Sequence, residues 1–200
     1  MNRGRIGILM FGAYLTILLI GMSWGSANAQ VKLVKPAKGG TIMINKSGSY
    51  FLGSNIAFAT AGAAAIRITS GVNNVTINLN GFTILGVGSG STTIGINAPT
   101  NSGITIVNGT VTKIPGKGIV LGPNSSIAGV QLIGNLGDGF TCGTGCLVTG
   151  NVINGNTGTG LVFSDTTSGY QNNIINGNGA TVTSGTNMGH NVCNGSTTCP

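Results

Sequence analysis

The feature that most constrains the fold of this chain is an apolar repeat with a period of about 21 positions. Successive members are separated by 23, 21, 21 and 21 residues, and each follows a small or turn-forming residue; they are Ile96, Ile119, Phe140, Leu161 and Val182. Repeats of this length in a chain with 37 glycines are typical of short strands that stack around one axis. The period therefore predicts a solenoid.

Two further apolar columns share this period. They are Val111, Ile133, Ile153 and Ile175, and Ile106, Ile127, Val148 and Tyr170. Three columns predict three short strands per coil of about 21 to 22 residues, with inward side chains stacked about 4.8 Å apart. A helical solenoid is excluded because its repeats are longer and glycine-rich segments are poor helix formers. We expect an all-β, parallel β-helix.

Glycine and asparagine occupy the segments between the columns. Residues 154–156 and 176–178 both read Asn-Gly-Asn, and these residue types tolerate the positive φ of a sharp bend. Gln131, Asn151 and Asn173 form a polar column that predicts a ladder of stacked amides. We favour an internal structural role for this ladder over a ligand-binding row of amides.

The N-terminal segment predicts export. Arg3 and Arg5 precede an apolar run over residues 6–20, and Ala-Asn-Ala at 27–29 fits a cleavage site before Gln30. Residues 1–29 are therefore interpreted as a secretory signal peptide, with an uncleaved anchor as the alternative. We expect no membrane-spanning segment after cleavage and a secreted, periplasmic or cell-surface location.

The repeat continues without a linker, which predicts one β-helix domain over residues 30–200. Residues 30–70 are expected to hold the N-terminal cap and the first coils, with short strands near 40–44 and 49–52. Residues 187–200 lose the apolar columns and are expected to form a C-terminal cap. Such caps cover strand edges that a solenoid would otherwise expose.

The basic charge is thinly spread. Without residues 1–29, seven Lys and Arg side chains face two Asp, a net charge of about +5. Nucleic-acid binding normally requires a dense basic face with exposed aromatic residues, so we expect no nucleic-acid partner. Contact with a polysaccharide or another cell-surface glycan is the partner that we expect.

Four cysteines in an exported chain indicate disulfides. Three connectivities are possible, and we favour the local pairs Cys142–Cys146 and Cys193–Cys199, of which the second would staple the C-terminal cap. The alternative of a four-thiolate zinc site has the wrong spacing. We expect no metal and no cofactor.

Several segments together resemble a known superfamily. They are residues 75–84 (VTINLNGFTI), residues 104–111 (ITIVNGTV), the Asn-Gly-Asn turns and the tail over residues 187–200. In these the chain is similar to bacterial exported right-handed parallel β-helix proteins of the pectate-lyase-like superfamily. The resemblance implies a right-handed β-helix but no single chemistry, since that fold hosts lyases, hydrolases and adhesins. Many of those relatives carry Asp where Asn78 stands here.

Catalysis on sugars requires carboxylates that this chain lacks. Glycoside hydrolysis uses two carboxyl groups about 5 to 10 Å apart, and the chain has no Glu and only Asp138 and Asp165. These differ by one coil and by six positions around it, roughly 20 Å of extended chain. We therefore expect no paired carboxylates and no catalytic residue.

Other catalytic arrangements are also incomplete. Lyase chemistry needs a Ca²⁺ site of several carboxylates beside a basic residue; Arg67, Lys113 and Lys117 are candidate bases, but the acidic cluster is missing. Asp138 and His190 are interpreted as a turn residue and a surface residue.

The sequence thus favours a non-catalytic exported β-helix, a glycan-binding or structural module of the cell envelope. The alternative is a polysaccharide lyase or glycoside hydrolase with a reduced active site.

Overall fold

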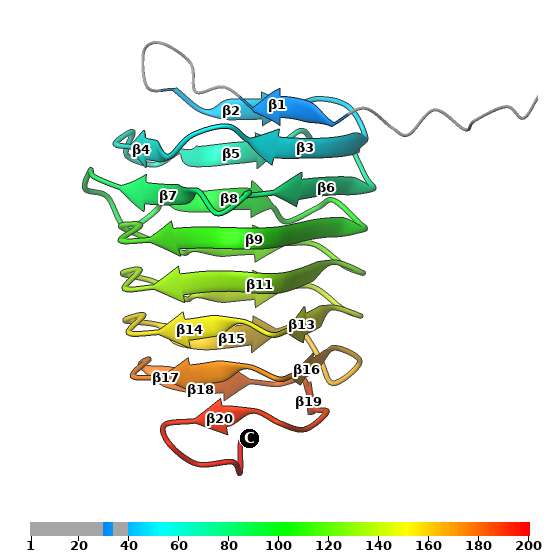
Figure 1. Ribbon diagram of the computed structural model, residues 1–200, viewed down its shortest axis with the longest axis vertical. Coiled ribbons are helices and arrows are strands. Elements are labelled where there is room, and N and C mark those ends of the chain that lie inside the picture. Colours follow the sequence, from blue (N-terminus) through cyan, green and yellow to red (C-terminus); the bar gives the residue numbers. More distant parts are fainter. Residues whose placement is uncertain (1–29, 34–39) are drawn as a thin grey trace, which may run out of the picture.

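The computed structural model describes residues 30–33 and 40–200, so the predicted signal peptide lies outside the described residues. Within these ranges the chain forms twenty β-strands and no helix. All pairings between named strands are parallel, and the strands stack along the long axis of the molecule (Figure 1). The chain is an all-β, right-handed parallel β-helix, as the apolar columns and the resemblance predicted.

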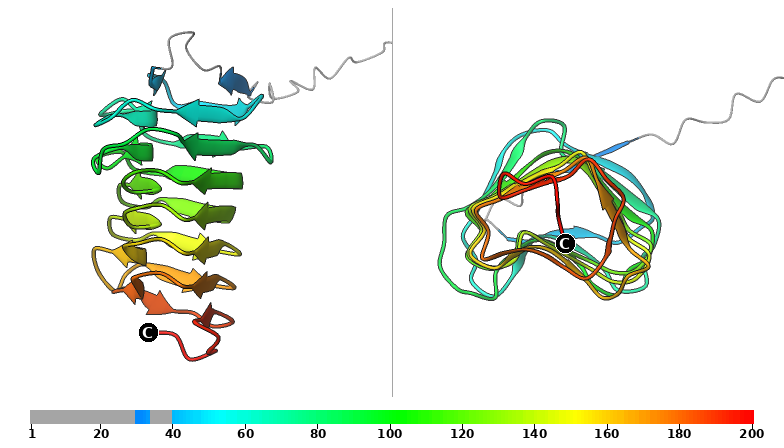
Figure 2. Two further views of the ribbon diagram at one scale, coloured as in Figure 1. Left: turned by 90° about the vertical axis from the view of Figure 1, so that its left-hand side faces the viewer. Right: turned by 90° about the horizontal axis from the view of Figure 1, so that it is seen from below.

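Each coil contributes strands to three faces (Figure 2). The seven-stranded sheet forms one face and contains β2 (Ile42–Ile44), β5 (Ala64–Ile68), β8 (Ile94–Ala98), β10 (Ile119–Leu121), β12 (Phe140–Cys142), β15 (Thr159–Phe163) and β18 (Ala180–Thr183). The thirteen-stranded sheet bends to form the other two faces.

The first arm of the bent sheet contains β1 (Val31–Leu33), β3 (Gly48–Leu52), β6 (Val75–Asn78), β13 (Leu147–Thr149), β16 (Gly169–Gln171) and β19 (Thr186–Asn187). The second arm contains β4 (Ile56–Phe58), β7 (Thr83–Gly86), β14 (Val152–Asn154), β17 (Ile174–Asn176) and β20 (Val192–Cys193). In the middle coils β9 (Ile104–Thr112) and β11 (Ser126–Ile133) run through both arms.

The first predicted column is confirmed. Its five members pair in sequence across β8, β10, β12, β15 and β18, and all are buried. A strand alternates its faces at every residue, so the neighbouring positions point outward. The column over Ile106, Ile127, Val148 and Tyr170 is confirmed in the same way.

The remaining column was wrong at one position. Leu132, not Ile133, pairs with Val111 and Ile153 and is buried, whereas Ile133 is only partly buried. Two adjacent apolar residues compete for one inward position, and the period of the repeat varies by a residue between coils. The register of β11 against β9 decides which of them enters the core.

Residues with positive φ lie in columns at the three corners. At the corner inside β9 and β11, for example, Asn108 (φ 57°) lies beside Gly129 (φ 62°). The same corner is occupied in later coils by Gly150, Asn172 and His190, all with positive φ. Glycine and asparagine adopt this conformation at least cost, which explains their abundance at the turns.

A glycine also precedes the first-column residue of each strand of the seven-stranded sheet from β8 to β15. At Gly139 a Cβ would lie 2.8 Å from the carbonyl oxygen of Gly160 and 3.0 Å from Asn156 Nδ2. Glycine is required there by close approach of the backbone. The Gly-apolar dipeptide of the repeat is therefore a packing feature.

Candidate functional site

The predicted amide ladder exists, but it begins at Asn151 and continues to Asn191. Asn151, Asn173 and Asn191 are buried and hydrogen-bond in series, with each Oδ1 accepting from a backbone N–H of the preceding coil. Gln131 is exposed on the outer surface of β11, so including it was wrong. Period alone placed Gln131 in the column, because it does not show on which side of the strand a residue lies.

A second ladder, over Asn135, Asn156 and Asn178, lies at the next corner. The recurring Asn-Gly-Asn was the signal that could have revealed it, since its last Asn directly follows the residue with positive φ. All these amides bond to the backbone and to one another. They hold the coils together and are not exposed for a ligand, which favours the structural interpretation.

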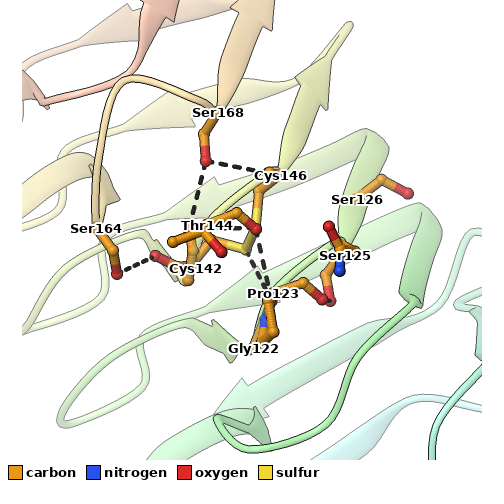
Figure 3. The surroundings of a disulfide bond; sticks show 12 residues. Gly122, Pro123, Ser125, Ser126, Cys142, Thr144, Cys146, Ser164 and Ser168 are labelled. Carbon is orange, nitrogen blue, oxygen red and sulfur yellow. Dashed lines mark hydrogen bonds between the residues drawn. A yellow bond between two sulfur atoms is a disulfide. The ribbon is translucent and has the colours of Figure 1, made fainter.

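The four cysteines form two pairs at disulfide distance, Cys142–Cys146 and Cys193–Cys199, with Cα separations of 6.5 and 5.4 Å. The first bridge is buried between coils (Figure 3). Ser168 of the following coil accepts a hydrogen bond from the N–H of Cys146 at 3.0 Å. The bridge therefore fills a corner at which the neighbouring coils use serine.

Asp138 and Asp165 do not meet. Asp138 precedes β12 and its Oδ1 accepts the N–H of Thr159 at 2.9 Å, whereas Asp165 follows β15 and accepts from Thr167 of its own turn. The two carboxylates thus lie beyond opposite ends of the strands, separated by the length of β15. This geometry offers no acid–base pair.

Asp138 has a cationic partner. Lys117 Nζ lies 2.9 Å from Asp138 Oδ2 and 3.4 Å from the hydroxyl of Thr141. Both side chains are partly exposed, so the pair contributes little stability. Its main effect is to neutralise Lys117 on this surface.

The remaining residues considered from the sequence are dispersed. His190 and Lys113 are exposed at corners with positive φ. Among residues 30–33 and 40–200 no group of three His, Cys, Asp or Glu side chains is placed to hold a metal. In the same residues no helix is long and apolar enough to cross a membrane.

A groove of about 220 Å³ lies on the outer surface of the seven-stranded sheet, near its N-terminal end. Met43, Arg67 and Asn97 form its floor; they pair in register across β2, β5 and β8 and point outward. Its wall comes from the turns after β5 and β8 and includes Thr69, Ser70, Pro99, Thr100 and Asn101.

The groove contains groups that have no partner among residues 30–33 and 40–200. Arg67 is exposed, and no ion pair or hydrogen bond of its guanidinium occurs in the described residues. Asn101 is 1% exposed and its Nδ2 donates to the carbonyl oxygens of Thr69 and Val72, both at 2.7 Å. Its Oδ1 is buried without a partner in the part of the chain described. The groove thus offers a cationic donor fork, and one of its wall residues holds a buried acceptor without a partner in the described residues.

The class of the protein follows from this geometry: a right-handed parallel β-helix with a polar groove on one outer sheet. A solved structure of similar fold is the Azotobacter vinelandii mannuronan C-5 epimerase AlgE4 A-module, with a TM-score of 0.50 and 15% identity over 84% of this chain and 68% of that one. No protein-family model matches the chain, and no curated protein is significantly similar in sequence. At this identity the likeness shows the fold alone.

Sequence reasoning considered Arg67 only as a possible base and missed the groove. Arg67 and Asn97 are 30 positions apart, a longer interval than the repeat, because this coil has extra residues in the corner between β6 and β7 and in the turn over residues 87–93 between β7 and β8. The period of the repeat therefore does not predict that Arg67 and Asn97 are neighbours. Only the pairing of β5 with β8 does.

Proposed function

We propose that this protein is a non-catalytic module that binds an extended glycan along the outer surface of the seven-stranded sheet. The groove at Arg67 is the observation that carries the proposal. It is the place on this sheet where unpaired polar groups converge, and a few well-placed polar groups in a concave site are what fix a ligand's orientation.

The rest of the surface suits a chain-like ligand. Beyond the groove the outward column continues as Val120, Thr141, Val162 and Thr183, one residue per coil. Methyl and hydroxyl groups alternate along it at about 4.8 Å intervals. Such a strip provides apolar contact and hydrogen bonds to successive sugars of a polymer lying parallel to the axis.

A matched pair of surface variants tests this assignment. Val120→Glu places a bulky charge in the middle of the proposed strip, whereas Val152→Glu places the same group on the outer surface of β14. We expect affinity electrophoresis on a panel of polysaccharides to show binding by the native protein and by Val152→Glu, and its loss in Val120→Glu. Equal binding by both variants would contradict the proposed surface.

Export supports the same role. Two disulfides are characteristic of an extracellular or periplasmic protein, and we propose that residues 1–29 direct export and are removed. N-terminal sequencing of the protein from the native cell is expected to begin at Gln30. A chain that retains Met1 in the cytosol would contradict this.

A lyase or hydrolase with a reduced site is the second candidate. The contact between Lys117 and Asp138 favours it, because an amine and a carboxylate meet beside the same strip. Purified protein would then release unsaturated or hydrolysed sugars, with or without Ca²⁺, and Asp138→Ala would abolish the release. We expect no product from either protein.

A further inference from the structure

We infer that the groove binds a single oxyanion on an otherwise neutral glycan, so that the ligand is sparsely charged and not a uniform polyanion. The inference rests on the proposed function and names the class of glycan. Three observations support it: the donors around Arg67, the unused acceptor of Asn101, and the distribution of charge on the rest of the sheet.

Arg67 is placed to receive an anion. Its guanidinium presents several N–H donors in one plane, which suits the paired oxygens of a carboxylate or a sulfate. Asn97, 9% exposed, pairs in register with Arg67 on the next strand. At the border of the groove the Thr100 hydroxyl donates to the Ser70 hydroxyl at 3.5 Å, which leaves the Ser70 hydroxyl as a neutral donor.

Asn101 indicates that the charged group belongs to a sugar. Two hydrogen bonds from its Nδ2 fix the orientation of the amide, which leaves Oδ1 as an acceptor. A buried acceptor without a donor costs free energy, and an anion without a proton, such as sulfate, cannot satisfy it. A sugar hydroxyl beside the anionic group supplies that donor.

The remaining surface does not favour repeated negative charge. From β8 to β18 the outward column is neutral, and Lys117 beside it is already paired with Asp138. Thr141, next to that pair, is three strands from Arg67, or about 14 Å. A polymer with a carboxylate on every sugar would desolvate several charges without gaining further cationic partners.

A matched series of hexasaccharides tests the inference with the full chain. The series comprises hexamannuronate, the same oligomer with all but one carboxylate reduced to the alcohol, and the fully reduced oligomer. Isothermal titration at 0.15 M salt is expected to show at least tenfold tighter binding of the singly charged oligomer than of the neutral one. Hexamannuronate is expected to bind no more tightly than the singly charged oligomer.

Two variants of equal charge change locate the effect. Arg67→Gln is expected to abolish the tenfold difference, whereas Lys113→Asn is expected to retain it. Lys113 lies at the corner before β10, away from the turns that wall the groove, and asparagine tolerates its φ of 53°. The Nε–Hε signal of Arg67 is assigned in NMR spectra as the signal that Arg67→Gln lacks. We expect this signal to move on titration with glucuronate or with glucose 6-sulfate. Comparing the two titrations shows whether carboxylate or sulfate is the preferred anion.

The outcomes separate the two proposals. Tenfold tighter binding of hexamannuronate than of the singly charged oligomer would overturn the inference. Unchanged selectivity in Arg67→Gln, or an Arg67 signal that does not move, would also overturn the inference. In either case the proposed function would still stand if the native protein binds glycan and Val120→Glu abolishes that binding. If no oligomer binds and no polysaccharide is retained, both proposals fail.

Discussion

Asn156 Oδ1 accepts two hydrogen bonds from Asn135, one from its backbone N–H at 3.0 Å and one from its Nδ2 at 2.8 Å. The two residues lie in successive coils, 21 positions apart, and both are buried. Asn156 in turn donates to the carbonyl oxygen of Leu132 at 3.0 Å. One side chain thus satisfies a backbone N–H and a backbone carbonyl of the preceding coil at a corner where strand pairing is interrupted.

The first prediction follows from this contact. Asn156→Ala removes the acceptor of the Asn135 backbone N–H and one of the two acceptors of Asn135 Nδ2, and it also leaves the carbonyl oxygen of Leu132 without its donor, so we expect a loss of about 2 to 4 kcal/mol in the free energy of unfolding. Asn154, two residues earlier at the end of β14, is exposed, and Asn154→Ala should cost less than about 0.5 kcal/mol. Urea unfolding followed by circular dichroism measures both. Equal losses would show that the ladder has no special role.

The second prediction separates two reasons for glycine. Gly139→Ala would press a methyl group against the next coil and should destabilise by about 3 kcal/mol. Gly134 has φ 62° and open space around it. Gly134→Ala should therefore lower the free energy of unfolding only through backbone strain, by about 1 kcal/mol. Gly134→Asn should recover most of that strain, since asparagine tolerates this conformation, whereas Gly139→Asn should be worse than Gly139→Ala.

The third prediction concerns the disulfides. Cys142 and Cys146 are 2% exposed, whereas Cys199 is only partly buried. Under mild reduction in native buffer we expect Cys193–Cys199 to open first, as read by mass spectrometry after alkylation. Replacing either pair by serine should cost about 2 kcal/mol, as expected for loops this short. Faster reduction of Cys142–Cys146 would contradict the buried placement.

The fourth prediction concerns alkaline pH. Burial raises the pKa of Tyr170, whose hydroxyl donates to the carbonyl oxygen of Pro200. In the unfolded chain a tyrosine ionises near pH 10, while the folded chain keeps this proton to higher pH. The folded state therefore binds more protons above pH 10, and stability falls as pH rises through that range.

Tyr170→Phe isolates this effect. The variant should be less stable at pH 7 by about 1 kcal/mol because the hydrogen bond is lost. The difference between native protein and variant should then shrink above pH 10. A constant difference from pH 7 to 11 would show that Tyr170 ionises equally in both states.

The sequence predicted the inner columns well, because burial imposes two periods at once. A strand alternates its faces every second residue, and a coil returns to the same strand after about 21 residues, so Phe140 and Leu161 had to coincide. The prediction failed where those periods do not decide which of two similar residues faces the core. Ile133 and Leu132 are both apolar, and Gln131 and Asn135 are both amides, and only the register of β11 assigns each of them to the core or to solvent.

The sequence by itself determined that coils stack around an apolar core and that the chain's two acidic residues are separated around the coil, and it favoured local pairing of the cysteines. The tertiary structure alone decided that Arg67, Asn97 and Asn101 surround one groove. The turns between coils differ in length, and that length is invisible to a periodic pattern. Hydrogen bonding between neighbouring strands fixes which distant residues become neighbours, and thereby where unpaired polar groups remain on the surface.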